Sequence, residues 1–364
     1  MKNNHMRRIL LVSLVIATSS FFMGCNSDTA EESPDNVEIS NTPNCETGFT
    51  GEPIRCEPGF LLEGVEFFER YVTADGIDWH VVEAGDLDAP TILFIHGVPE
   101  SWYDWHQQMI DLSSDYHVIA FDLKGYGRSD HPNADASVGS GFYSASQVAT
   151  EITPLMNALG LNEPVTLVSH DWGTLVSSYL VFQDPTRFNA WARMSAPLGG
   201  DGEKILELNT QFEQFQDFNF CRTVFSQPQF IFNLYGYDGE LGLNSSQSIP
   251  NAIVDRVNEE WRFNGLTPNT ACKYYSDTPE IMDPFFWSDT LVDMMAMINF
   301  PVYLIQAEDD DRQPLHLFDG SVADLPEDVA TLYPISESGH FMMSEQPDKI
   351  TQAIRELIHE IALF

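Results

Sequence analysis

The stretch Val168-Ser169-His170-Asp171-Trp172-Gly173 closes an apolar run over residues 164–168 and precedes an apolar, helix-like run over residues 174–182. This order predicts a strand, an abrupt turn and a helix. Ser169 and Gly173 stand two positions before and after Asp171, and such small neighbours let a backbone turn sharply and expose the central side chain. The pattern therefore indicates a nucleophile elbow with Asp171 at its centre.

An aspartate at this position implies a particular chemistry. The carboxylate of Asp171 can attack carbon to form an ester, which an activated water then hydrolyses. A carboxylate suits displacement at an sp3 carbon, such as an epoxide carbon or a carbon bound to halogen, better than attack on an ester carbonyl. The alternative is an Asp171 that only caps the following helix.

Short apolar strands alternate with helical patterns along the chain, which predicts an α/β fold with a mostly parallel sheet and helices on both faces. Strands are expected at residues 67–72, 77–83, 91–95, 117–121, 164–168, 190–194, 301–305 and 329–333, and helices at residues 147–159 and 348–361. Residues 198–290 are aromatic-rich and helix-like without buried strands, so we expect a helical cap there. The two parts of the core are then residues 61–197 and 291–364.

The first 24 residues have the features of an export signal, because basic residues precede an apolar run over residues 9–22 that is too short for a stable membrane span. The run ends in Phe22-Met23-Gly24-Cys25, which resembles a bacterial lipoprotein signal whose Cys becomes lipidated. We expect an outer-membrane lipoprotein or a periplasmic enzyme, with residues 25–60 as a tether. Ordinary secretion is the alternative, because Phe22 replaces the usual Leu of that motif.

Export implies an oxidising compartment, in which disulfides persist. If Cys25 carries the lipid, four cysteines remain, and three pairings are formally possible. We favour Cys45–Cys56, which would close a short loop, and Cys221–Cys272, which would hold one later region together. Buried thiols at Cys221 and Cys272 are the alternative.

The chain is strongly acidic: 55 Asp and Glu against 17 Lys and Arg give a formal net charge of −38. Such a surface repels nucleic acid and anionic lipid headgroups. We therefore expect no nucleic-acid partner, and contact with a membrane only through an N-terminal lipid anchor.

The loop His96-Gly97-Val98-Pro99-Glu100 follows an apolar strand, and ligands in open α/β sheets bind at the carboxyl ends of strands. Its backbone can therefore face the elbow. We expect the N–H groups of Val98 and Trp172 to form an oxyanion hole, which stabilises charge as the ester is hydrolysed. His96 is expected to hold the loop by hydrogen bonds, and Pro99 is counted with the substrate-binding residues. An ordinary tight turn is the alternative.

A catalytic acid is expected after a late strand, where Glu308-Asp309-Asp310-Asp311 follows the apolar residues 301–305. One of these acids should orient the catalytic imidazole, and the spacing favours Asp310, with Asp309 as the alternative. The imidazole is assigned to His340, which follows the last strand and would activate the hydrolytic water. His170 is expected only to pack beneath the elbow.

Four motifs together carry a resemblance to a known family: His96-Gly97-Val98-Pro99-Glu100-Ser101-Trp102, Asp122-Leu123-Lys124-Gly125-Tyr126-Gly127-Arg128-Ser129, Ser169-His170-Asp171-Trp172-Gly173 and Gly339-His340-Phe341. They look like the epoxide hydrolase branch of the α/β-hydrolase superfamily, over residues 63–364. The order of nucleophile, acid and base matches that superfamily. The resemblance implies the α/β-hydrolase fold, a small-molecule epoxide as substrate, and neither a metal nor an organic cofactor.

Haloalkane and haloacid dehalogenases share the Asp nucleophile and form the alternative, with an organohalide as substrate. Many haloalkane dehalogenases carry Asn where this chain has Val98, and haloacid dehalogenases carry Arg residues where it has Trp172 and Leu175. Both departures favour an epoxide, although the Trp172 indole could bind a leaving halide. A surface-tethered binding protein with a vestigial site is a third hypothesis, and the complete triad argues against it.

Epoxide opening also needs a proton donor for the departing oxygen, and two cap tyrosines usually serve in this branch, because a phenol can donate while neutral. Lys273-Tyr274-Tyr275-Ser276 resembles the second-tyrosine segment, which implies Tyr275 as donor and Tyr274 as its neighbour at the substrate. The first segment should lie near Phe218-Asn219-Phe220-Cys221, which holds no tyrosine. Either Tyr235 or Tyr237 then substitutes, or one donor suffices. Packing of Tyr275 in the cap core is the alternative.

Overall fold

The computed structural model describes residues 59–134, 141–196, 213–278, 297–317 and 329–362. The predicted signal at residues 1–24, the lipid site Cys25 and the pair Cys45–Cys56 lie outside these residues. The predicted tether, residues 25–60, extends too far, because Phe60 begins the first strand, β1 (Phe60–Leu62). The Phe60 ring stacks on that of Phe67 with centroids 5.7 Å apart, so apolar packing holds Phe60 on the sheet.

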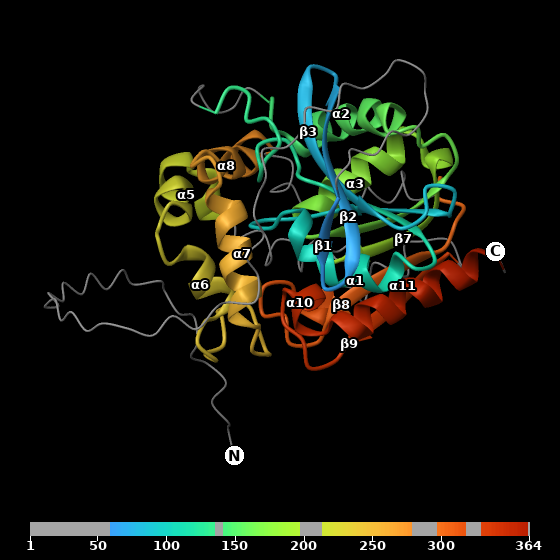
Figure 1. The fold of residues 1–364 in the computed structure, drawn as a ribbon. Coiled ribbons are helices and arrows are strands. Elements are labelled where there is room, and N and C mark those ends of the chain that lie inside the picture. Colours follow the sequence, from blue (N-terminus) through green and yellow to red (C-terminus); the bar gives the residue numbers. More distant parts are fainter. Residues whose placement is uncertain (1–58, 135–140, 197–212, 279–296, 318–328, 363–364) are drawn as a thin grey trace, which may run out of the picture. The chain divides into compact units, whose positions relative to one another are not determined.

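The strands that follow β1 are β2 (Val65–Ala74), β3 (Ile77–Ala84), β4 (Thr91–Ile95), β5 (His117–Phe121), β6 (Val165–His170), β7 (Phe188–Met194), β8 (Val302–Ala307) and β9 (Ala330–Ile335). Within the described residues, nine strands form one sheet in the order β1-β2-β3-β5-β4-β6-β7-β8-β9 (Figure 1). The pairs β1–β2, β2–β3 and β3–β5 are antiparallel, and the other five neighbouring pairs in this order are parallel. The mostly parallel α/β sheet predicted from the sequence is therefore confirmed.

The two central strands show why apolar runs predicted this sheet. The structure gives β4 and β5 the predicted bounds, and all their residues are buried except the first, Thr91. Helices cover both faces of a parallel sheet, so its inner strands are apolar throughout. At the antiparallel edge, Asp75 and Gly76 join β2 to β3 with φ values of 52° and 76°. Positive φ at both positions is the geometry of a tight hairpin turn.

The main core helices are α1 (His106–Leu112), α2 (Ala145–Ala158), α3 (Trp172–Gln183) and α11 (Pro347–Ile361). Figure 1 shows α2 and α3 together on one side of the sheet and α1 and α11 together on the other. Helix α2 begins before the predicted residue 147, because the Ser144 side chain accepts a hydrogen bond from the Gln147 N–H and caps it. Shorter core helices are η1 (Trp102–Trp105), η2 (Pro185–Arg187), η6 (Leu315–Leu317) and α10 (Met342–Glu345).

The segment between β7 and β8 is helical where the structure describes it. Residues 213–278 hold η3 (Glu213–Gln216), α5 (Phe218–Phe225), α6 (Phe230–Tyr235), α7 (Asn251–Arg262) and α8 (Thr267–Asp277), and no strand. We call this helical segment the cap. The predicted limits of the cap, residues 198 and 290, lie outside the described residues. Among the residues that the structure describes, no helix is long and apolar enough to span a bilayer.

Candidate active site

Asp171 stands between β6 and α3 on a backbone of unusual conformation. Its φ of 49° and ψ of −122° lie in a region that residues with a side chain rarely adopt. The turn is possible because its neighbours lack side chains: a Cβ on Gly173 would lie 2.3 Å from the His96 carbonyl oxygen, and a Cβ on Gly97 would lie 2.6 Å from Cβ of Asp171. A side chain at either glycine would therefore force the elbow and the neighbouring loop apart.

The three residues predicted as nucleophile, base and acid form a continuous chain. Nε2 of His340 lies 3.6 Å from Oδ2 of Asp171, and Nδ1 of His340 lies 2.8 Å from Oδ2 of Asp310. Asp310 is 2% exposed, whereas Asp309 is an exposed residue, so the structure places Asp310 on the imidazole. Its other oxygen, Oδ1, accepts hydrogen bonds from the N–H groups of Arg312 and Gln313 at 2.8 and 3.0 Å, which fix the carboxylate.

The charges in this chain of side chains shift their pKa values. Burial raises the pKa of Asp310, but the charge of His340 and hydrogen bonds from the ring and two backbone N–H groups bring it down to about 2. Burial also raises the pKa of Asp171, while two nearby imidazoles and the Val98 N–H lower it below its ordinary value. For His340, burial lowers the pKa, but the two carboxylates raise it well above the ordinary value. The free site therefore holds an imidazolium between two carboxylates.

The loop that follows β4 supplies a backbone donor to Asp171. The Val98 N–H donates to Oδ1 of Asp171 at 3.0 Å, and Pro99 follows Val98 through a cis peptide bond. The Trp172 N–H, the other predicted donor, makes no hydrogen bond to this carboxylate within the described residues. The Val98 N–H thus marks where negative charge on an ester oxygen would be stabilised.

Tyr275 of α8 lies close to the elbow. Its ring meets the Trp172 ring edge to face, with centroids 4.7 Å apart. Burial and the charge of Asp171 raise the pKa of Tyr275, whereas a hydrogen bond with the Trp172 side chain and the charge of Arg312 lower it. The net shift is upward, so the phenol stays protonated at neutral pH and can donate a proton near the nucleophile.

The alpha/beta hydrolase fold family matches residues 90–347, which include Asp171, Asp310 and His340. The chain belongs to this family. Among curated relatives, epoxide hydrolase 2 of Siraitia grosvenorii is 37% identical over 125 residues, which are 34% of this chain and 37% of that protein. Epoxide hydrolase 1 of Caenorhabditis elegans is 23% identical over 310 residues, which are 82% of this chain and 72% of that protein.

The same fold is found in a solved structure, potato (Solanum tuberosum) epoxide hydrolase I. The TM-score is 0.65 at 22% sequence identity, and the match covers 81% of this chain and 99% of the potato chain. The alignment with the Siraitia protein is shorter and spans just over a third of that relative's length (37%).

The other three candidate tyrosines of this α/β hydrolase have hydroxyls that are bound elsewhere. Their acceptors are the Lys124 carbonyl for Tyr274 at 2.7 Å, Asp104 for Tyr235 at 2.9 Å, and Asp255 for Tyr237 at 3.0 Å. Tyr235 and Tyr237, the two residues predicted as alternatives for the missing donor, thus each donate their hydroxyl hydrogen to an aspartate in this structure. Tyr274 is also not placed to bind substrate through its hydroxyl, and its ring packs edge to face against Trp172, with centroids 5.9 Å apart.

His96 supports the loop, as expected. Its Nδ1 donates to the Gly97 carbonyl at 2.8 Å, and its Nε2 accepts from the Leu123 N–H at 2.9 Å. Both ring nitrogens are occupied, and the Leu123 donor sets the tautomer. Burial lowers the pKa of His96, which keeps the ring neutral in this structural role.

A second buried carboxylate–imidazole pair lies against the catalytic one. Nδ1 of His170 lies 2.5 Å from Oε1 of Glu100, and Nε2 of His170 donates to the His340 carbonyl at 3.0 Å. The other oxygen of Glu100 accepts from the Gly97 N–H at 2.6 Å. His170 packs beneath the elbow as predicted, but Glu100 had no predicted role. Its position inside the His96–Glu100 motif was the available signal, and the pair links the Val98 loop to the base.

The cap holds the loop that carries the base. The His340 N–H donates to the Asn244 carbonyl at 2.7 Å, and a Cβ on Gly339 would lie 2.4 Å from the same oxygen. Oε2 of Glu345 accepts from the N–H groups of Gly339 and Ser246 at 3.0 and 2.7 Å. No local pattern marks Asn244 as a site residue, because the contact joins segments that are far apart in the sequence.

Cys221 of α5 and Cys272 of α8 form a disulfide, as predicted. Cys272 lies one helical turn before Tyr275, so the bond ties the helix of Tyr275 to its neighbour in the cap. The rings of Phe215 and Phe225 pack against Tyr275 in the same region, with centroids 5.6 and 6.0 Å away.

Replacing both cysteines of this disulfide with Ala should lower the free energy of unfolding. For a separation of 51 residues, the lost loop-closure entropy of the unfolded chain corresponds to a stabilising free energy of about 4 kcal/mol. Urea unfolding of the wild type and of the Cys221→Ala/Cys272→Ala variant measures the difference, and reduction of the wild type should reproduce it. Equal stability of both proteins would mean that packing alone holds α5 and α8 together.

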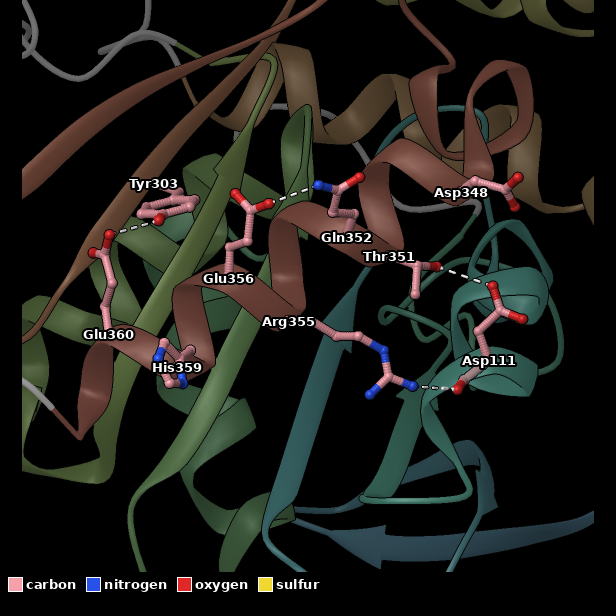
Figure 2. A pocket seen from close by; sticks show the side chains of 9 residues that line it. All are labelled: Asp111, Tyr303, Asp348, Thr351, Gln352, Arg355, Glu356, His359 and Glu360. Carbon is pink, nitrogen blue, oxygen red and sulfur yellow. Dashed lines mark hydrogen bonds between the residues drawn. The ribbon is translucent and has the colours of Figure 1, made fainter.

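A separate groove lies along α11 (Figure 2). Polar, acidic and basic side chains line it, and several bond to one another: Tyr303 donates to Glu360 at 2.7 Å, and Thr351 donates to Asp111 at 3.2 Å. Tyr303 lies near the start of β8, whereas Asp310 follows the end of that strand, so the groove lies toward the opposite end of β8 from the triad. Within the described residues, no three His, Cys, Asp or Glu side chains are grouped as metal ligands.

Proposed function

We propose that this α/β hydrolase opens an epoxide to a vicinal diol through an ester on Asp171. The observation that carries the proposal is a carboxylate at the elbow, with His340 3.6 Å from it and a protonated phenol nearby. The relatives named above are called epoxide hydrolases, which supports this substrate class. The substrate is a small molecule, and the residues assigned to the reaction are Asp171, His340, Asp310 and Tyr275.

In the first step, an oxygen of Asp171 attacks an epoxide carbon and the ring carbon–oxygen bond breaks. Tyr275 gives its proton to the departing oxygen, which leaves a hydroxy ester on Asp171 and a phenolate on Tyr275. Because Asp171 has lost its charge, one of the two carboxylates that raise the pKa of His340 is gone. A proton of the His340 imidazolium then passes through water to the Tyr275 phenolate, and the imidazole becomes neutral.

In the second step, neutral His340 takes a proton from water, and the hydroxide attacks the carbonyl carbon of the ester. The Val98 N–H stabilises the oxyanion that forms. The intermediate collapses, the diol leaves with the remaining carboxyl proton, and Asp171 is again a carboxylate beside an imidazolium. The balance is one epoxide and one water consumed for each diol released.

A single turnover in heavy-oxygen water, with enzyme in excess over styrene oxide, tests the ester mechanism. Both oxygens of the first diol come from the epoxide and from Asp171, so that diol should carry no label. The peptide that contains Asp171 should gain one heavy oxygen. A labelled first diol with an unlabelled peptide would show direct attack by water and would overturn the proposal.

Dehalogenation by the same triad is the alternative for this site. A halide would need a free donor, but the Trp172 side chain hydrogen-bonds with Tyr275. This contact favours the epoxide as substrate, because the Trp172 side chain then interacts with Tyr275, the group that would protonate the epoxide oxygen. Halide release from haloalkanes and haloacids, without turnover of epoxides, would reverse the choice.

Replacing Tyr275 with Phe should lower kcat for epoxide opening by about 10²- to 10⁴-fold, the range of a lost proton donor. The Phe ring keeps the packing against Trp172, Phe215 and Phe225. Pre-steady-state measurements should show slow ester formation and unchanged ester hydrolysis. The matched control is Tyr237→Phe, whose hydroxyl lies on Asp255 at the surface. Equal rates for wild type and Tyr275→Phe would assign the donor elsewhere.

We further propose that the enzyme is exported in a bacterium as an outer-membrane lipoprotein anchored through a lipid on Cys25, with a soluble periplasmic enzyme as the alternative. The basic and apolar pattern before Cys25 supports this, and a cap disulfide suits an oxidising compartment. Metabolic labelling with a fatty acid should mark the wild type and not Cys25→Ser. Export without labelling of either protein would favour ordinary secretion.

A further inference from the structure

Arg312 is a cation at the edge of the proposed site to which neither a motif nor the mechanism assigns a role. It lies two residues after Asp310, and its N–H donates to Oδ1 of that acid at 2.8 Å. Arg312 itself is half-buried. The side chain therefore starts from the turn that fixes the triad carboxylate.

The guanidinium of Arg312 lies beside the loop of the base. Its Nε donates to the side-chain oxygen of Asn244 at 2.9 Å. The backbone carbonyl of the same Asn244 accepts the His340 N–H at 2.7 Å. One cap residue thus contacts both the backbone of His340 and the arginine, which places the guanidinium where the cap meets the core, beside the loop that carries His340.

The terminal amino groups of Arg312 have no partner among the described residues. Within the part of the chain that the structure describes, they make no hydrogen bond, and no carboxylate pairs with the guanidinium. By contrast, Lys124 and Arg128 each pair with glutamate side chains. Arg312 thus has no acidic partner in the described ranges, in a chain that has 55 acidic residues and 17 basic ones.

The electrostatics agree with this placement. The charge of Arg312 lowers the pKa of Tyr275, while the charge of Asp171 raises it. Both charges therefore act on the phenol that would protonate the epoxide oxygen. A guanidinium whose Nε is held by Asn244 presents its two terminal nitrogens as a pair, which matches the two oxygens of a carboxylate.

We propose that Arg312 selects epoxides that carry a carboxylate, by binding that carboxylate through its terminal amino groups while Asp171 attacks the ring. The inference rests on the proposed function and narrows its substrate class. The overall charge of −38 repels an anionic substrate, so a local cation is needed to hold one at the site.

The test compares two matched epoxides, 3-phenylglycidate and its uncharged amide 3-phenylglycidamide. The measured quantity is the ratio of their kcat/KM values, in which any general change of activity cancels. In Arg312→Gln, the ratio should fall roughly 10- to 100-fold, the range of a lost hydrogen bond to a charged group. Arg312→Lys should keep part of the preference, because it keeps the charge but loses the paired donors.

The matched control is Arg222→Gln, which removes the same charge from an exposed position on α5 and should leave the ratio unchanged. An unchanged ratio in Arg312→Gln, or an equal loss with both epoxides, would overturn the inference while the proposed function stands. Calorimetric measurement of phenylacetate and phenylacetamide binding further separates failure of the Arg312 inference from failure of the proposed function. Loss of phenylacetate binding alone in Arg312→Gln supports the carboxylate site even if no epoxide is turned over, and equal binding by wild type and variant overturns it.

Discussion

Replacing Asp171 with Asn is expected to lower kcat for an epoxide by at least about 10⁴-fold, as removal of a nucleophile does in hydrolases with a covalent intermediate. The amide is isosteric and can still accept the hydrogen bond from the Val98 N–H, which reaches Oδ1 at 3.0 Å in the wild type. It cannot form the ester. Initial rates of diol formation, taken on freshly purified protein, give the measurement.

The control for this variant is Asp309→Asn, which changes the charge equally one residue before the triad acid. Asp309 is exposed and should be replaceable without loss of rate. A rate in Asp171→Asn that rises with storage would show hydrolysis of the amide back to the acid. A stable rate within tenfold of the wild type would mean that another group is the nucleophile.

The same variant tests the electrostatics of the base. Two carboxylates raise the pKa of His340 in the free enzyme, and Asp171→Asn removes one of them. The His340 pKa should therefore fall, and the imidazolium should lose its proton at a lower pH than in the wild type. NMR titration of the imidazole nitrogens follows this directly. An unchanged pKa would mean that Asp310 alone sets the charge state of the base.

Replacing His340 with Gln is expected to stop the reaction at the ester. Asp171 and Tyr275 remain for the first step, but no imidazole activates the water, so ester hydrolysis should slow by about 10²- to 10⁴-fold. Loss of the imidazole also removes an interaction that lowers the pKa of Asp171, so the Asp171 pKa should rise in this variant. Alkylation of Asp171 should therefore weaken as the pH falls toward that higher pKa. Intact mass after exposure to mixed epoxides and haloacids should show a gain equal to one whole epoxide.

The double variant His340→Gln/Asp171→Asn provides the control and should gain no mass. A gain equal to a haloacid minus its hydrogen halide would instead identify a dehalogenase. No adduct from either set of compounds would remove support for Asp171 as the nucleophile and favour the binding-protein hypothesis. Each outcome therefore distinguishes one of the functions considered for this site.

The sheet and the elbow could be predicted because their signals are local. Continuous apolar runs matched β4 and β5 to the residue, since an inner parallel strand is buried on both faces. Ser169 and Gly173 on either side of Asp171 predicted the turn, and the structure shows that a Cβ on Gly173 would lie 2.3 Å from the His96 carbonyl oxygen. Strand β1 was missed, because three residues show no periodicity and only the packing of Phe60 holds them on the sheet.

The partners of the site's side chains were decided by the tertiary structure. Four consecutive acids follow the late strand. Spacing favoured Asp310 but left Asp309 open, and the structure shows Asp310 buried against His340. Neighbouring tyrosines in one helix differ in the same way: Tyr274 donates to the Lys124 carbonyl, while Tyr275 lies by the nucleophile. The sequence by itself determined which kinds of side chain reach the carboxyl ends of the strands. The tertiary structure decided which of them meet, because each partner comes from a distant segment whose position depends on packing across the cap and the core.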